Sequence, residues 1–151
     1  NVPRPGVEEQ IDNEKYEYRP RDWAAAEATG IPDLLTRLNT IRREHPALQR
    51  LRGLTVHPTD DESVLCFSRH LDAAQSPTGQ ADTVIVVLNI DPQRTHETLV
   101  HLDLEALGAG GAGQVLVRDL LSGDAFTWGP DAFVRLDPWT RCGHVLAVEA
   151  R

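Results

Sequence analysis

The feature that most restricts the fold is a series of eight short strand-like segments that fill the sequence after Gly53. Each is rich in β-branched and other apolar residues and is bounded by turn-forming residues, as is typical of strands. No long helix separates them, whereas parallel neighbours need crossover helices. The segments are 54–57, 63–69, 83–90, 97–104, 114–120, 124–129, 133–137 and 144–150. The sequence therefore predicts a mainly β fold, an antiparallel β-sandwich over residues 53–151.

Two of these segments differ in their apolar pattern. Residues 83–90, TVIVVLNI, are apolar on both faces and predict the central strand, whereas residues 97–104, ETLVHLDL, alternate and predict one exposed face. The connections SPTGQAD, residues 76–82, and GAGGAG, residues 108–113, are expected to be flexible hairpin loops.

The first fifty residues have a different pattern. Residues 33–45 place apolar side chains on one helical face and charged ones on the other, which predicts an amphipathic helix ended by Pro46. Residues 22–30 predict a short helix closed by Gly30. A segment of this size does not bury enough surface to fold alone. Residues 1–52 are therefore expected to be the end of a larger domain whose upstream part is missing.

Composition argues against several classes of function. The formal net charge is -8, and the arginines are interleaved with acidic residues, so a nucleic-acid surface is not expected. No apolar run approaches the roughly 20 residues that span a bilayer, so no membrane segment is expected either. Cys66 and Cys142 lie in or beside apolar runs and predict buried free thiols, which indicates a reducing, cytoplasmic location. The scattered histidines give no support for a metal site.

Lys15 is the only lysine of the chain, and it stands beside Tyr16 in the segment NEKYEYRPRDW, residues 13–23. An ammonium offers three donors to sugar hydroxyls or phosphate oxygens, and a tyrosine adds a hydroxyl and a flat apolar face. The residues alone also allow a plainer interpretation, in which Lys15 is a solvated loop charge and Tyr16 a packing residue.

Longer motifs connect the chain to a known family. The sequence LNTIRREHPAL, followed by VIVVLNID, VRDLLSGDAFTWG and VRLDPWTRCGHVLAV, resembles the end of α-amylase-family enzymes. The resemblance implies that residues 1–52 are the C-terminal end of a (β/α)8 catalytic barrel, with its strand-8 loop and helix 8. Residues 53–151 would then be the β-sandwich C-terminal domain.

A narrower resemblance concerns the segment EEQIDNEKYEYRPRDW. It is similar to the segment after the eighth barrel strand in the bacterial α-1,4-glucan:maltose-1-phosphate maltosyltransferases. The matching positions are Glu14, Lys15, Tyr16, Arg19, Pro20, Arg21, Asp22 and Trp23. These retaining glycosyltransferases move maltosyl units from α-maltose 1-phosphate to the non-reducing end of α-1,4-glucans, and in them the lysine and tyrosine contact the donor.

That resemblance implies substrate-binding roles for Lys15 and Tyr16. It places the catalytic carboxylates on upstream barrel strands, so no catalytic residue is expected on this chain, and the chain alone is expected to be inactive. No cofactor or metal is implied. The partners implied are α-maltose 1-phosphate, an α-1,4-glucan and the missing barrel, and the intact protein is expected to be a homodimer.

Two alternatives stay open. The chain could be the C-terminal part of another amylase-family enzyme, such as a trehalose synthase. It could also be a stand-alone carbohydrate-binding module that uses Trp128 or Trp139, although a single tryptophan in a strand more often serves packing.

Overall fold

The computed structural model describes residues 22–149, and the chain divides into two compact units, residues 1–40 and 41–151. In the first unit, α1 (Trp23–Glu27) is capped by Asp22, whose carboxylate accepts the N–H of Ala25 at 2.9 Å. Helix α2 (Ile31–Glu44) begins after Gly30 and continues into the second unit. Both predicted helices are therefore confirmed.

All eight predicted strands form, within two or three residues of the predicted bounds. They are β1 (Leu54–His57), β2 (Val64–Leu71), β3 (Asp82–Asn89), β4 (His96–His101), β5 (Val115–Asp119), β6 (Ala125–Trp128), β7 (Asp131–Leu136) and β8 (Gly143–Val148). Every pairing is antiparallel. The predicted fold class, an antiparallel β-sandwich, is confirmed.

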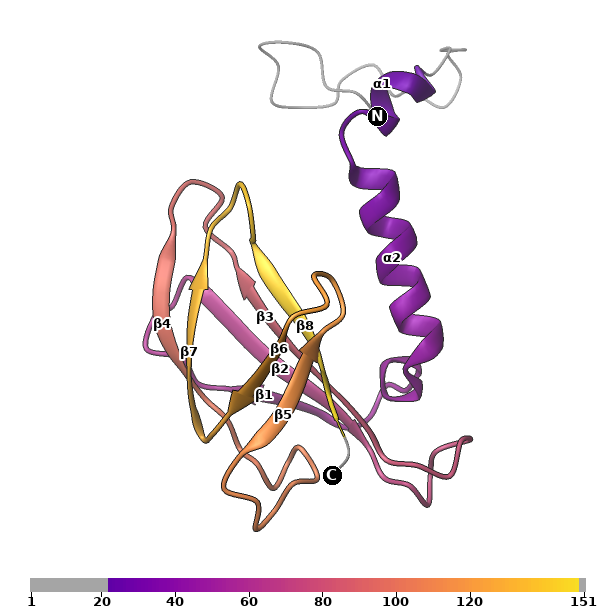
Figure 1. Ribbon diagram of the computed structural model, residues 1–151, viewed down its shortest axis with the longest axis vertical. Helices are drawn as coiled ribbons and strands as arrows, with labels where there is room; N and C mark the ends of the chain where they lie inside the picture. Colours follow the sequence, from indigo (N-terminus) through magenta and orange to yellow (C-terminus); the bar gives the residue numbers. More distant parts are fainter. Residues whose placement is uncertain (1–21, 150–151) are drawn as a thin grey trace. The chain divides into compact units, whose positions relative to one another are not determined.

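The strands form two sheets of unequal size. Six strands follow the order β1-β2-β3-β8-β5-β6, and β4 pairs only with β7. Figure 1 shows the β4–β7 pair lying across from the larger sheet. Strand β3 is central and almost fully buried, whereas β4 alternates between exposed and buried residues, as their sequences predict.

The core lies between the two sheets. Alternate side chains of the six-stranded sheet meet the inward side chains of β4 and β7, because successive residues of a strand point to opposite faces. The fully buried residues Ile85, Val117 and Leu146 from the larger sheet belong to the same cluster as Val100 and Leu136 from the smaller one. This cluster holds the sandwich together.

One prediction about the connections is wrong. The segment at 76–82 does join adjacent strands, β2 and β3, but GAGGAG at 108–113 is not a hairpin loop. It carries the chain from β4 in the small sheet to β5 in the large one. At Gly108 the φ angle is +72° and the backbone lies against the ring of His70, so a side chain would clash there.

A short 3-10 helix, η1 (Pro46–Gln49), links α2 to the sandwich. Ile41, at the end of α2, is 2% exposed and clusters with Val84 and Val145 on the outer face of the six-stranded sheet. Gln49 donates from its side-chain amide to the carbonyls of Arg42 and Arg43, which closes the last turn of α2. Residues from Ile41 onward thus pack with the sandwich, and the assignment of residues 1–52 to the end of a barrel stays a prediction.

Candidate functional site

The two residues predicted to bind substrate, Lys15 and Tyr16, lie outside the described residues. The sites that the structure does describe belong to the sandwich. Their polar side chains are dominated by histidines paired with aspartates, an arrangement that the scattered spacing of these residues did not predict.

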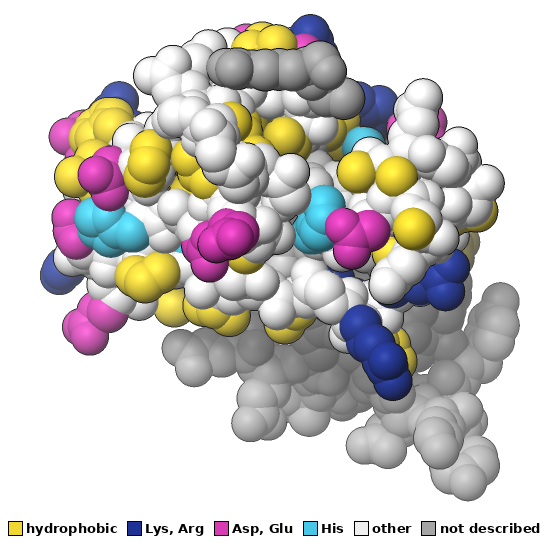
Figure 2. Space-filling model, turned by 90° about the horizontal axis from the view of Figure 1, so that it is seen from below, with side chains coloured by type: hydrophobic (Ala, Val, Ile, Leu, Met, Phe, Trp, Pro, Cys, Tyr) yellow, Lys and Arg dark blue, Asp and Glu magenta, His cyan; other side chains and the backbone are white. Residues whose placement is uncertain are grey.

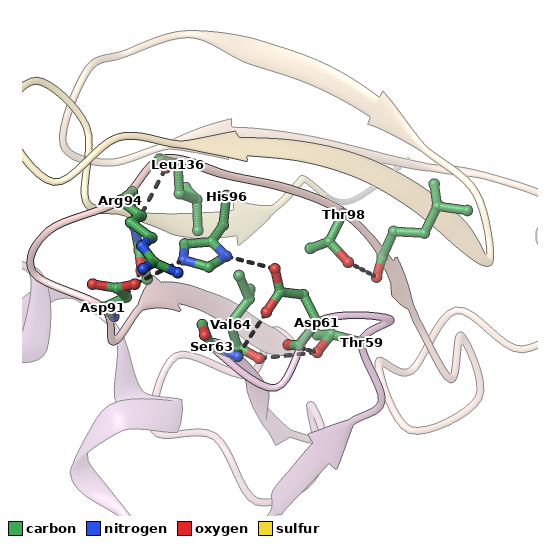
Figure 3. Close-up of polar contacts among 11 residues, drawn as sticks. Thr59, Asp61, Ser63, Val64, Asp91, Arg94, His96, Thr98 and Leu136 are labelled. Atoms are coloured by element: carbon green, nitrogen blue, oxygen red, sulfur yellow. Dashed lines mark hydrogen bonds and ion pairs between the residues drawn. The ribbon is translucent and has the colours of Figure 1, made fainter.

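His96 is the first residue of β4, and both of its ring nitrogens meet carboxylates. Nδ1 lies 2.5 Å from Asp61 Oδ2, and Nε2 lies 3.2 Å from Asp91 Oδ2, so the ring is held between two loops (Figure 3). An ionised carboxylate only accepts hydrogen bonds, so both nitrogens donate and the imidazole is charged. The hydrogen bond to Asp61, helped by that to Asp91, raises the pKa of His96.

The two carboxylates respond in the opposite direction. The hydrogen bond from His96 and the backbone N–H of Ser63 lower the pKa of Asp61. The backbone N–H of Gln93 and then His96 lower the pKa of Asp91. All three groups therefore favour their charged forms, which stabilises the ion pairs.

His101, the last residue of β4, repeats the arrangement. Its Nδ1 lies 2.7 Å from Asp131 Oδ1, and its Nε2 lies 2.8 Å from Asp60 Oδ1. The bond to Asp60 and then that to Asp131 raise the pKa of His101. We call His96 and His101, with their four aspartates, the β4 clamps.

The β4 clamps exist because the β1–β2 loop runs beside β4. Thr59 and Val100 form an antiparallel bridge, the N–H of His101 donates to the carbonyl of Pro58, and the N–H of Asp60 donates to that of Leu99. The neighbouring residues Asp60 and Asp61 thereby reach opposite ends of one strand. The clamps connect the small sheet to a loop of the large one.

His57 shows the contrasting state. It is 2% exposed, its Nδ1 accepts the backbone N–H of Asp103 at 3.2 Å, and its Nε2 lies 2.8 Å from the hydroxyl of Ser68. A ring that accepts at one nitrogen and donates at the other is neutral. Burial lowers its pKa, against the attraction of Asp103.

A second buried pair joins His144 to Asp119 at 2.7 Å. Burial alone would raise the pKa of Asp119, but the hydrogen bonds from His144 and from the backbone N–H of Leu121 hold that pKa below its usual value. The carboxylate thus fixes the turn after β5. Burial of both side chains suits this pair for structure rather than for proton transfer.

The histidines of the β4 clamps are not arranged as catalytic bases or metal ligands. In the β4 clamps both ring nitrogens donate, so no lone pair remains to take a proton or bind a cation. Within residues 22–149, no group of three His, Cys, Asp or Glu side chains is placed to hold a metal ion.

The cysteines match the prediction in part. Both are free, and burial raises the pKa of Cys66 to about 12. Cys142 is exposed, so the prediction that it is buried is wrong. It stands in the β7–β8 connection, one residue before β8 begins, where the apolar run that suggested burial has not yet entered the sheet.

A cavity of about 740 Å³ lies beside the η1–β1 connection. Arg50, Arg52 and His70 line it together with Asp72 and two glutamines. The positive φ of Gly53, +79°, lets the chain press against the backbone of His70 at its wall. Its lining holds no Trp, Tyr or Phe on which a sugar ring could stack.

Charged side chains are scattered over the face drawn in Figure 2. On this face, acidic, histidine and hydrophobic side chains are interspersed, and the described Arg side chains form no continuous stripe. Among the described residues, no helix combines the length and the apolar character that crossing a bilayer requires.

Comparison with known proteins places the sandwich in a family. Residues 56–148 match the family model described as GLGE, C-terminal. The chain belongs to this family. The matched residues run from β1 to the end of β8, so the family domain is the sandwich itself.

The relatives extend the similarity to nearly the whole chain. The alpha-1,4-glucan:maltose-1-phosphate maltosyltransferase of Bifidobacterium longum is 49% identical over 149 residues, 99% of this chain and 20% of the relative. Enzyme 1 of that name from Streptomyces coelicolor is 47% identical, over 98% of this chain and 21% of the relative. The enzyme of that name from Mycolicibacterium smegmatis is 42% identical, over 95% of this chain and 20% of the relative. The resemblance seen in the sequence is confirmed, and the chain spans about a fifth of the length of these curated relatives.

Proposed function

We propose that this chain is the C-terminal part of an α-1,4-glucan:maltose-1-phosphate maltosyltransferase. The observation that carries the proposal is the match to relatives of that name over nearly the whole chain, including the segment with Lys15 and Tyr16. The match to the GLGE C-terminal family supports the same conclusion for the sandwich. The trehalose synthase alternative has no comparable support.

The reaction is a retaining transfer, which needs a carboxylate nucleophile and a carboxylic acid about 5–5.5 Å apart. The nucleophile displaces phosphate from α-maltose 1-phosphate and forms a β-maltosyl-enzyme, while the carboxylic acid gives its proton to the leaving phosphate. The 4-hydroxyl of the glucan then attacks, loses its proton to the second carboxylate, and restores the α configuration. Both carboxylates belong to the part of the enzyme that precedes this chain.

The contribution of this chain is binding and support. The Lys15 ammonium donates hydrogen bonds to α-maltose 1-phosphate, and Tyr16 adds a hydroxyl and a flat ring beside the maltosyl unit. In the family's barrel architecture the loop after strand eight lies at the rim where substrates bind. The sandwich supports the last helix from outside, through Ile41 and the residues around it.

The test replaces Lys15 and Tyr16 in the longer protein. Lys15→Ala removes the hydrogen bonds that the charged ammonium makes, which are worth roughly 1.5–3 kcal/mol each. The kcat/KM for maltose 1-phosphate therefore falls by about one to two decades. Tyr16→Phe deletes one neutral hydrogen bond and costs less, roughly 0.5–1.5 kcal/mol. Phosphate release with a maltooligosaccharide acceptor measures both effects.

Tyr18→Phe, in the same segment but outside the matched motif, is the control and should leave kcat/KM unchanged. The 151-residue chain alone is the blank, because it lacks the nucleophile and the acid. Thermal unfolding should be unaffected by all three substitutions, since a rim loop contributes little to the core. Wild-type donor kinetics in Lys15→Ala would contradict the binding role, and lost stability with normal kinetics would make both residues structural.

A further inference from the structure

The tryptophans of the sandwich differ sharply in exposure. Trp128, on β6, is 7% exposed and stacks on Phe126 with ring centroids 6.2 Å apart. Trp139, in the β7–β8 connection, is 72% exposed. Trp128 is thereby a packing residue, and only Trp139 of the two presents its indole to a ligand.

The turn that carries Trp139 is firmly held. Asp137 Oδ1 accepts the backbone N–H groups of Trp139, at 2.9 Å, and Thr140, at 3.1 Å. Asp137 and Arg141 exchange two backbone hydrogen bonds of 2.9 Å each. The exposed ring therefore stands on a preorganised turn, which lowers the entropy lost when a ligand binds.

The β3–β4 connection fastens this turn from a second side. The hydroxyl of Thr95 donates to Asp137 Oδ2 at 2.9 Å, the N–H of Asn89 donates to the carbonyl of Cys142 at 2.8 Å, and its side-chain amide reaches the carbonyl of Leu136 at 3.4 Å. Figure 1 shows the two connections at the same end of the sandwich. The turn thus belongs to a braced surface rather than to a free loop.

Arg141 follows Trp139 by two residues and remains accessible, as does its partner Asp124. Arg141 Nη2 pairs with Asp124 Oδ2 at 2.9 Å, and their side chains are 41% and 50% exposed. Both retain hydrogen-bonding capacity toward solvent, since a guanidinium has five donors and a carboxylate about four acceptor positions. A flat apolar ring such as this exposed indole can pack on the face of a sugar, and exposed donors and acceptors can bond to its hydroxyls.

We propose that Trp139 is a stacking platform for an α-1,4-glucan chain. The inference rests on the proposed function, because that function makes a glucan the acceptor. The apolar C–H face of a glucose unit packs on the indole, and neighbouring hydroxyls bond to Arg141 and Asp124. The sandwich then takes part in holding the polymer, in addition to supporting the helix.

The test measures glucan binding by the 151-residue chain and by the longer protein, without maltose 1-phosphate. Glycogen retardation in native gels and titration with maltoheptaose report the affinity, and cellohexaose tests for the α linkage. Trp139→Ala should weaken α-glucan binding about three- to tenfold, the size expected for one aromatic contact. Trp139→Phe should recover part of the loss.

Phe133→Ala is the matched control, because Phe133 is also exposed, at 60%, on neighbouring β7. It should leave glucan affinity unchanged. Equal affinity for glycogen in wild type and Trp139→Ala overturns the proposal, as does a change of oligomeric state in place of a change of glucan binding, which would make the ring a protein contact. Missing maltosyl transfer in the longer protein would overturn the proposed function instead, so the two failures are distinguishable.

Discussion

The two faces of the six-stranded sheet are covered by different means. The inner face meets β4 and β7 through a continuous apolar cluster in which Ile85, Leu136 and Leu146 are fully buried. The buried part of the outer-face cluster is only Ile41, Val84 and Val145. The free energy gained by burying apolar side chains grows with the buried area, so the inner face contributes far more stability than the outer face. The smaller patch needs polar contacts in addition.

Asp82, the first residue of β3, supplies those contacts. Its two oxygens lie 2.8 Å from His45 Nδ1 and 2.8 Å from the backbone nitrogen of Ala47, so one carboxylate holds the end of α2 and the start of η1. Burial would raise the pKa of Asp82, but the hydrogen bonds from His45 and Ala47 outweigh it and lower that pKa. The charged and hydrogen-bonded contacts of Asp82 thus add to the small apolar patch in stabilising the outer face.

The largest loss of unfolding free energy is expected from a substitution inside the sandwich. Leu146→Ala leaves a cavity in the inner cluster and should cost about 2–5 kcal/mol of unfolding free energy. Val56→Ala, at a residue 64% exposed on edge strand β1, is the control and should stay within about 0.5 kcal/mol. Urea unfolding measures both. A small loss in Leu146→Ala would mean that the inner face is not the main source of stability.

An intermediate and local effect is expected at the outer face. Asp82→Asn keeps the size of the side chain but removes its charge, so the contacts to His45 and Ala47 should weaken by about 1–3 kcal/mol in total. Hydrogen exchange should then quicken in residues 41–49 while the amides of β8 stay protected.

Asp72→Asn is the control for that substitution, because Asp72 also meets a histidine but its side chain is 71% exposed. It should leave exchange in residues 41–49 unchanged. Uniform loss of protection across both faces in Asp82→Asn would show that the outer patch and the sandwich unfold as one unit.

The sequence predicts the elements well because each carries a local signal. The double-sided apolar run of β3, the alternation of β4 and the one-sided leucines of α2 are read from neighbours a few residues apart. The role of Asp82 has no such signal, since its partner His45 is 37 residues away.

The β4 clamps escape prediction for the same reason. His96 and Asp61 are 35 residues apart, and His101 and Asp60 are 41 apart. They meet only because the β1–β2 loop runs along β4. This placement depends on β4 pairing with β7 in a separate sheet. The crossing of GAGGAG between sheets follows from the same topology, and strand patterns alone do not specify it.

The smallest effect is expected at the β4 clamps, whose ion pairs join the small sheet to the β1–β2 loop. Solvent screens these ion pairs in part, and most of all at His101, whose side chain is 38% exposed. The raised pKa values of His96 and His101 mean that the folded state binds protons more tightly than the unfolded chain, whose histidines titrate near 6.5. Their stabilisation is therefore complete below about pH 6.5 and is lost as pH rises through the raised values. Below about pH 3.8 it also falls, because the pKa values of Asp61 and Asp91 are lowered in the folded state.

Replacing both histidines by glutamine isolates this contribution. The difference in unfolding free energy between wild type and the His96→Gln, His101→Gln variant should be largest near pH 6 and shrink toward about pH 9, since only charged histidines hold the aspartates. His57, whose pKa is lowered, changes stability in the opposite direction, but it is present in both proteins and cancels. Urea unfolding at several pH values gives the difference directly. A difference that stays constant with pH would mean that the clamps act as neutral hydrogen bonds, and that burial alone attaches the small sheet to the inner face.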